Sequence, residues 1–121
     1  MSFWKGKRVV VTGGSGLIGT PMFAKLADLG ISWGCNLDIP EYDVLDYNDI
    51  LGGVSRADVC IHLAAISHVE DSRSRRHNTF DVNVRGTYNV LEACLDAGVK
   101  SVVVASSNHV YGNQDVFPVP E

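Results

Sequence analysis

KRVVVTGGSGLIG, residues 7–19, is the most informative stretch of this 121-residue chain. Two basic residues lead into three valines and a threonine, and such a β-branched run ending at glycine predicts a buried parallel strand. Gly13, Gly16 and Gly19 follow at three-residue spacing, and Gly14 also fits the pattern G-x-G-x-x-G. Because the turn joins a strand to an amphipathic helix, it has the context of a phosphate-binding turn.

Each glycine in such a turn has its own physical reason. One makes the tight bend, one lets the backbone approach a diphosphate, and one lets the helix pack on the strand, while the helix N-terminus offers unpaired N–H groups. The residues that we assign to a dinucleotide cofactor here are Gly13, Gly16, Leu17, Ile18 and Gly19. The alternative is a glycine-rich bend without a ligand. A Walker A loop is excluded, because no Lys-Ser/Thr pair follows the glycines.

Beyond the turn, hydrophobic periodicity predicts a helix over Leu17–Leu29, closed by Gly30. Two short runs follow, Ile31–Leu37 and Tyr42–Leu45, and both are compatible with strands. The four residues between them leave no room for a crossover helix, so one of the two is short or irregular.

The rest of the chain continues to alternate. Asp46 is the expected N-cap of a brief helix through about Val54, and Ala57–Leu63 is predicted to be a buried strand. We expect a loop over Ala64–His77, then a long helix over Asn78–Ala97. A last strand is expected over Val99–Ala105. This order predicts an α/β fold with a doubly wound, mostly parallel Rossmann-type sheet of five strands, forming one NAD(P)-binding domain over residues 1–121.

Composition narrows the class of protein. The chain is 45% hydrophobic and 20% charged, as expected of one globular domain, and its net charge of −4 argues against nucleic-acid binding. Three cysteines without C-x-x-C spacing argue against a disulfide framework or a zinc site, and we assign no metal. No apolar run is long enough for a membrane span. We therefore expect a cytoplasmic protein without a membrane partner.

An acidic residue about 20 positions beyond the glycines accepts hydrogen bonds from the adenine ribose in folds of this type and disfavours a 2′-phosphate. Asp38 is the candidate, which favours NAD over NADP. Its alternative is an exposed turn aspartate before Ile39-Pro40.

Five stretches together resemble the N-terminal part of the extended short-chain dehydrogenase/reductase family, the NAD-dependent epimerases and dehydratases that act mostly on nucleotide sugars. These stretches are residues 12–19 (TGGSGLIG), 43–46 (DVLD), 62–65 (HLAA), 81–93 (DVNVRGTYNVLEA) and 106–112 (SSNHVYG). The short segment over Ile31–Asp46 is closer to the fucose-synthase and rhamnose-reductase types, which tend to use NADP. NADP therefore remains possible.

The resemblance implies further site residues, each at a matching position. Asp43 and Val44 are expected to flank the adenine, and Leu63, Ala64 and Ala65 to pass close to the diphosphate and ribose. Asn83 is expected to complete the site from the long helix. Ser107 matches the catalytic Ser/Thr of the family, whose hydroxyl bonds a sugar oxygen.

One element of the family pattern is missing. None of the four tyrosines has a lysine four residues later, so the chain lacks the Tyr-x-x-x-Lys pair and is expected to be inactive alone. We favour a fragment of a longer enzyme, in which a nucleotide sugar is the substrate, over a natural short protein that only binds a dinucleotide. The runner-up function is a non-catalytic sensor or partner-binding module. An uncovered face on the helix Asn78–Ala97 predicts a homodimer or other self-association.

For two further groups of residues, a structural or solvated role is favoured over a role in binding a ligand. His62 lies in a predicted buried strand, where a hydrogen-bonded core histidine is favoured over a metal ligand. Arg73, Arg75 and Arg76 are expected in a solvated loop, with contact to a sugar-nucleotide diphosphate as the alternative.

Overall fold

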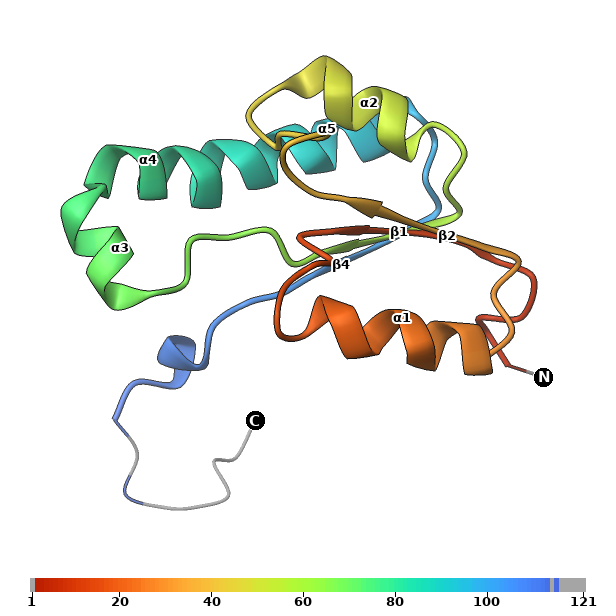
Figure 1. Cartoon of the computed structure of the whole chain (residues 1–121), viewed down its shortest axis with the longest axis horizontal. Coiled ribbons are helices and arrows are strands. Elements are labelled where there is room, and N and C mark those ends of the chain that lie inside the picture. The colour runs from red at the N-terminus through yellow and green to blue at the C-terminus, as the bar shows by residue number, and fades with distance from the viewer. Residues whose placement is uncertain (1, 114, 116–121) are drawn as a thin grey trace.

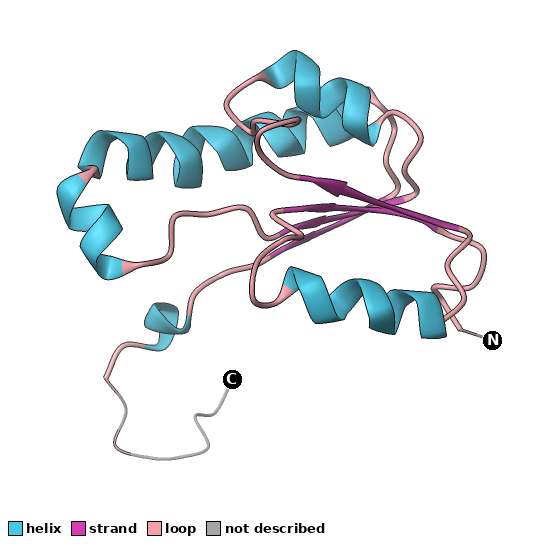
Figure 2. Ribbon diagram, viewed as in Figure 1, coloured by secondary structure: helices cyan, strands magenta, loops and turns pink. Residues whose placement is uncertain are grey.

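Four parallel strands form one sheet with helices on both faces in the computed structural model, which describes residues 2–113 and 115 (Figures 1 and 2). The strands are β1 (Arg8–Thr12), β2 (Trp33–Leu37), β3 (Val59–His62) and β4 (Ser101–Val104). The helices are α1 (Gly19–Asp28), α2 (Tyr47–Val54), α3 (Val69–Ser74), α4 (Arg76–Phe80), the π-helix η1 (Asp81–Gly86), α5 (Thr87–Asp96) and the 3-10 helix η2 (Asn108–Tyr111).

The strand order is β2-β1-β3-β4, so the chain leaves β1 toward one edge and returns on its other side. Helix α1 covers one face of the sheet, and α2 and α5 cover the other (Figure 1). The valines of β1 divide between these faces: Val10 packs in the cluster with α2 and α5, whereas Val9 and Val11 pack against the α1 side. An apolar run is required because both faces of β1 are buried. The doubly wound, parallel Rossmann-type sheet is thus confirmed.

The predicted strand over Tyr42–Leu45 is wrong, and the described sheet has four strands where we expected five. This segment is a loop and turn. The Val44 side chain is buried, and the Val44 carbonyl accepts a hydrogen bond of 2.9 Å from the Asn89 side chain of α5. A helix side chain therefore satisfies backbone that would otherwise need a strand partner.

The expected loop over Ala64–His77 is also partly wrong, because it contains the six-residue helix α3. Acidic residues in the first turn, Glu70 and Asp71, favour the N-terminus of this helix. Beyond it, α4, η1 and α5 are contiguous over residues 76–96, which confirms the predicted long helix (Figure 1). Gly98, with φ of 70°, follows its C-terminal end.

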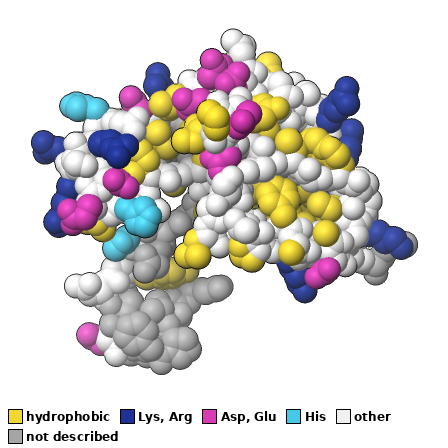
Figure 3. Space-filling view, viewed as in Figure 1, with side chains coloured by type: hydrophobic (Ala, Val, Ile, Leu, Met, Phe, Trp, Pro, Cys, Tyr) yellow, Lys and Arg dark blue, Asp and Glu magenta, His cyan; other side chains and the backbone are white. Residues whose placement is uncertain are grey.

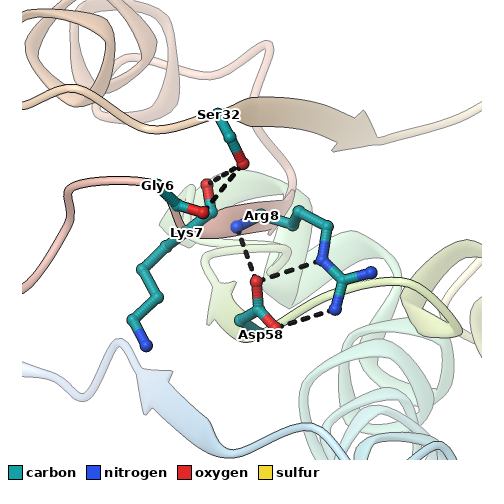
Figure 4. Close-up of polar contacts among 5 residues, drawn as sticks. All are labelled: Gly6, Lys7, Arg8, Ser32 and Asp58. Carbon is teal, nitrogen blue, oxygen red and sulfur yellow. Dashed lines mark hydrogen bonds and ion pairs between the residues drawn. The ribbon is translucent and has the colours of Figure 1, made fainter.

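At the opposite end of the strands from the glycine turn, an ion pair joins β1 to the residue before β3 (Figure 4). The Asp58 carboxylate accepts three bonds from Arg8: from the backbone N–H at 2.9 Å, from Nε at 3.1 Å and from Nη2 at 2.8 Å. Ser32 reaches the same end of β1 by donating to the carbonyls of Gly6 and Lys7. These contacts fix where the three strands begin.

The Arg8–Asp58 pair predicts an acid-sensitive contribution to stability. The side chain and backbone N–H of Arg8 hold the pKa of Asp58 well below its ordinary value of 3.8. Folding therefore favours the ionised carboxylate, so this stability is complete above pH 3.8 and is lost as the pH falls below that value. We expect Asp58→Asn to lower stability at pH 7 and to flatten the acid limb of urea-unfolding midpoints measured from pH 7 to pH 2.5. Arg8→Gln should flatten the same limb, and a limb unchanged in both variants would contradict the assignment.

Candidate cofactor-binding site

The ends of all four strands meet at one edge of the sheet. Thr12 is in register with Leu37 of β2 and with His62 of β3, and His62 is in register with Val104 of β4. The residues that follow these positions therefore leave the sheet side by side. In a doubly wound sheet a ligand binds at this carboxyl edge, where the connections diverge, and here that point lies between β1 and β3.

Two glycines of the turn are required by packing within the protein. Gly13 has φ of 68°, and a Cβ placed on it would lie 2.7 Å from both Cα and N of Ala64. A Cβ on Gly19 would collide with the backbone of Gly14. The turn is therefore pressed against the Leu63–Ala64 backbone on one side and against the start of α1 on the other.

Gly16 differs from both, because nothing in the protein requires a glycine there. Its φ is negative, and a Cβ on it would meet only the carbonyl oxygen of Gly13, at 3.4 Å. The neighbouring Leu17 and Ile18 are 93% and 60% exposed, so they do not join the buried stripe of α1 as predicted. In the described part of the chain their amides donate no hydrogen bond. The N-terminus of this ten-residue helix can bind a diphosphate, because its amides are free and no side chain at Gly16 covers the backbone.

Asn36 of β2 also holds the turn, and the sequence analysis missed it. Its Oδ1 accepts from the Gly14 N–H at 2.8 Å, which fixes the amide orientation, and its Nδ2 donates to Ser15 Oγ at 2.9 Å. The available signal was an asparagine inside a predicted strand, where this residue type is depleted.

Asp38 lies directly after β2 and contacts the same turn. Its Oδ2 accepts from the Ser15 N–H at 3.1 Å, and its Oδ1 accepts from the Ile39 N–H at 3.0 Å. An ionised carboxylate has about four acceptor positions, so two bonds leave it able to accept from a ribose hydroxyl. The structure thus places Asp38 against the glycine turn.

The residues expected at the adenine are divided between surface and core. Asp43 is exposed, and its Oδ1 accepts from the Leu45 N–H at 2.9 Å. Val44 is only 7% exposed, and a Cβ on Gly86 would lie 2.7 Å from its Cγ2. Its side chain therefore packs toward η1, and any part that Val44 plays in binding falls to its backbone.

Leu63, Ala64 and Ala65 continue from β3 along the turn. The Leu63 N–H donates to the Thr12 carbonyl at 3.0 Å, and the Ala64 N–H donates to Thr12 Oγ1 at 3.3 Å. Asn83 of η1 fixes the next residue, because its Oδ1 accepts from the Ile66 N–H at 2.8 Å and its Nδ2 donates to the Ile66 carbonyl at 3.0 Å. Asn83 thus acts on the loop backbone and sets the course of the segment beside the glycines.

Ser107 follows β4 by three residues and is exposed. Its Oγ accepts from the His109 N–H at 3.2 Å and so caps η2. Because an accepting hydroxyl keeps its own proton, this cap leaves Ser107 able to donate to a ligand oxygen.

The basic corner where α3 meets α4 is held by local pairs. Arg73 pairs with Glu70 at 3.9 Å and Arg75 with Asp71 at 3.7 Å; the Asp71 side chain is about half exposed and the other three are mostly exposed. Figure 3 shows blue and cyan side chains over this corner, and an open hollow there is lined by residues 74–78. These exposed pairs match the solvated interpretation. In the part of the chain that the structure describes, no three His, Cys, Asp or Glu side chains gather as a metal site would require.

Residues 9–121 match the model of the NAD dependent epimerase/dehydratase family. The UDP-N-acetyl-alpha-D-glucosaminuronate decarboxylase of Bacillus cytotoxicus is 32% identical over 123 residues, which cover 88% of this chain and 38% of the relative. The 3 beta-hydroxysteroid dehydrogenase/Delta 5→4-isomerase of Mycobacterium tuberculosis is 35% identical, over 90% of this chain and 34% of the relative.

A solved structure gives the same fold. The UDP-glucose-4-epimerase of Stenotrophomonas maltophila, with bound NAD and formylated UDP-arabinopyranose, superposes with a TM-score of 0.83 and is 29% identical. The match covers 93% of this chain and 40% of the epimerase. The chain therefore spans between about a third and two-fifths of the length of these three proteins. None of the helices within the described residues has the length and apolar character of a membrane-crossing segment.

Proposed function

The chain belongs to the NAD dependent epimerase/dehydratase family, and we propose that it forms the dinucleotide-binding part of an oxidoreductase that acts on a nucleotide sugar. The observation that carries this proposal is Gly16. Packing accounts for Gly13 and Gly19, whereas Gly16 has a negative φ, and a Cβ on it would meet only the Gly13 carbonyl oxygen, at an ordinary contact distance. A glycine without an internal reason, next to the free amides of a helix N-terminus, is what close approach of a diphosphate requires.

In this proposal each segment at the carboxyl edge of the sheet contacts a different part of the ligands. The amides of Leu17 and Ile18 bind the diphosphate, and the Leu63–Ala65 backbone forms the opposite wall. Asp43 and Val44 border the adenine. A bound dinucleotide would supply a hydride acceptor for a sugar carbon, and Ser107 would donate a hydrogen bond to the oxygen on that carbon.

Asp38 sets the choice of cofactor. Its carboxylate accepts from a ribose hydroxyl, and its negative charge repels a phosphate on the same ribose. The contact between Asp38 and the Ser15 N–H supports this role, because it fixes the carboxylate beside the glycine turn. We therefore propose NAD as the preferred cofactor and NADP as the weaker one.

Calorimetric titration of the 121-residue chain with NAD and with NADP tests the proposal. We expect NAD to bind at least tenfold more tightly, a difference of about 1.4 kcal/mol. Asp38→Asn should reduce this preference several-fold, because asparagine keeps an oxygen for the Ser15 N–H but loses the charge. Equal affinities in the unmodified chain would contradict the role of Asp38, and no binding of either dinucleotide would contradict the function.

Turnover distinguishes the enzyme from the non-catalytic sensor. We expect no reaction of UDP-glucose or dTDP-glucose with the chain alone, since it contains no Tyr-x-x-x-Lys pair. A longer natural chain that contains these residues should turn over a nucleotide sugar and should lose most of that activity in Ser107→Ala. Dinucleotide binding without turnover in the complete natural protein would favour the sensor.

We also propose that the contiguous helix over residues 76–96 pairs with a second copy of the chain. Its apolar stripe consists of side chains that are between 43% and 73% exposed, namely Phe80, Val84, Tyr88, Leu91 and Leu95. Figure 3 shows hydrophobic side chains along α4 and α5. Spacings of four and three residues place the stripe on one side of the helix, and such a stripe is self-complementary about a two-fold axis.

Analytical ultracentrifugation tests this association. We expect the chain to sediment as a dimer at tens of micromolar, and Leu91→Lys to shift it toward monomer by at least tenfold in dissociation constant. Val69→Lys is the matched control, because Val69 is 58% exposed but lies on α3, outside the stripe. A monomer throughout, or equal effects of both substitutions, would contradict pairing through this helix.

A further inference from the structure

A chain of hydrogen bonds passes through His62 at the carboxyl end of β3. The ring Nδ1 lies 2.6 Å from Thr12 Oγ1, and the ring Nε2 lies 2.9 Å from Thr87 Oγ1. His62 and Thr12 are buried, at 3% and 0% exposure. Both ring nitrogens are thus bonded to hydroxyl groups, one on β1 and one on α5.

The direction of every bond in this chain follows from one carbonyl. Thr87 Oγ1 lies 2.8 Å from the backbone oxygen of Asn83, which can only accept, so the Thr87 proton is used there. Thr87 Oγ1 must therefore accept from His62, and the imidazole proton sits on Nε2. In a neutral ring Nδ1 is then an acceptor, so Thr12 donates to it.

The same series of hydrogen bonds joins the segments that form the cofactor site. Thr12 precedes Gly13, and its Oγ1 also accepts from the Ala64 N–H. At the other end, the Asn83 carbonyl accepts a hydrogen bond from the Thr87 hydroxyl, and the Asn83 side chain holds the Ile66 backbone. Through Thr12 and Thr87, His62 therefore connects the strand before the glycine turn to the π-helix. Asn83 of that helix in turn holds the loop that follows β3.

We propose that His62, as the neutral tautomer protonated at Nε2, is a positioning residue that sets the crevice between β1 and β3 for the dinucleotide. This role rests on the proposed function. His62 touches no ligand in the proposal: it orients Thr12, which in turn fixes the Ala64 amide beside Gly13.

Protonation would break this arrangement. A second ring proton on Nδ1 would face Thr12 Oγ1, and the Thr12 hydroxyl proton would then lose its acceptor in a buried position. The neighbours offer no compensating charge: Thr12 on β1, Val104 on β4 and Thr87 on α5 are uncharged. Burial accordingly lowers the pKa of His62.

The charged residues on the elements that pack against β3 have other partners or lie at other ends. They are Arg8, which pairs with Asp58; Asp81 and Arg85, which pair with each other; Glu92 and Asp96, which lie near Tyr47; and Lys25 and Asp28 of α1, which covers the opposite face of the sheet from α5 (Figure 1). A fall in pH is therefore expected to act by protonating the His62 ring itself, and not by neutralising a charged neighbour.

The tautomer can be observed directly in the chain without ligand. Long-range ¹H–¹⁵N correlation spectra at pH 7 should show His62 as the neutral Nε2–H tautomer. A cationic ring, or a proton on Nδ1, would overturn the proposal regardless of whether the chain binds a dinucleotide.

Binding of NAD from pH 8 to pH 5.5 tests the positioning role. We expect the affinity of the unmodified chain to fall toward the acid end, as the His62 ring gains its second proton. His62→Gln should bind within a few-fold of the unmodified chain at pH 7 and show a flat profile, because glutamine offers an amide donor group and a carbonyl acceptor and gains no proton in this range. His62→Leu, which offers neither, should bind at least tenfold more weakly at every pH while melting cooperatively.

The outcomes separate the two proposals. Parallel pH profiles for the unmodified chain and His62→Gln would overturn the role of His62 while leaving NAD binding intact. Failure of the unmodified chain to bind NAD at any pH would overturn the proposed function, and with it this role.

Discussion

Gly13→Ala should lower the free energy of unfolding by about 2–5 kcal/mol. About 1–2 kcal/mol comes from forcing alanine to a positive φ, and about 1–3 kcal/mol from overpacking against backbone. The Ala64 backbone, 2.7 Å from the new Cβ, cannot move without breaking the hydrogen bond that its N–H donates to Thr12 Oγ1. Urea unfolding followed by far-ultraviolet circular dichroism measures the loss.

Gly98→Ala is the matched control for this prediction. Gly98 has nearly the same φ, 70°, but a Cβ on it would meet nothing within 4 Å. Its substitution should therefore cost only the conformational part, about 1–2 kcal/mol. If the two variants lost equal stability, the close approach of the glycine turn to the Ala64 backbone would not be limiting.

Gly16→Ala should have the opposite profile, with stability little changed and dinucleotide binding about 100-fold weaker, or about 2.7 kcal/mol. A methyl group at this position meets only the Gly13 carbonyl oxygen, at an ordinary contact distance of 3.4 Å, so the fold accommodates it. The same methyl would stand between the backbone and a bound diphosphate. Calorimetric titration with NAD, alongside a urea-unfolding curve, measures both quantities.

Gly52→Ala controls for the effect of adding a methyl group elsewhere on the surface. Gly52 lies within α2, and a Cβ on it would meet nothing within 4 Å. This variant should bind NAD as the unmodified chain does and should gain up to about 1 kcal/mol of stability. Unchanged affinity in Gly16→Ala would remove the observation on which the proposed function depends.

Much of the fold could be predicted because its signals are local. A valine run, a glycine turn and a helical stripe identify β1 and α1. Asp46 caps α2 as expected, accepting from the amides of Asn48 and Asp49 at 2.9 and 3.1 Å. The predicted core position of His62 is likewise confirmed by its burial and its two hydroxyl partners.

The errors arose where distant contacts decide the outcome. Tyr42–Leu45 has the composition of a strand, but Asn89, 45 positions beyond Val44, satisfies its carbonyl instead. The exposure of Leu17 and Ile18 has a different, local origin, because α1 begins only at Gly19 and the two residues belong to the turn. Periodicity alone does not separate a helix from the turn that precedes it.

The candidate site divides in the same way. Pattern and spacing identified the glycines and Asp38, which the structure brings together at one turn. Asn36 and the bonds between Thr12, His62 and Thr87 could not be derived, because each joins residues more than 20 positions apart. A hydrogen-bond chain of this kind leaves no periodic trace in the sequence.

The central claim is that the glycine turn at the N-terminus of α1 binds the diphosphate of a dinucleotide through the free amides of Leu17 and Ile18. Titration of ¹⁵N-labelled chain with NAD, followed by amide chemical shifts, tests it most directly. We predict saturable shifts that are largest at Gly16, Leu17 and Ile18. Saturable shifts confined to another part of the molecule, such as the hollow lined by residues 74–78, or no shifts at all, would contradict it.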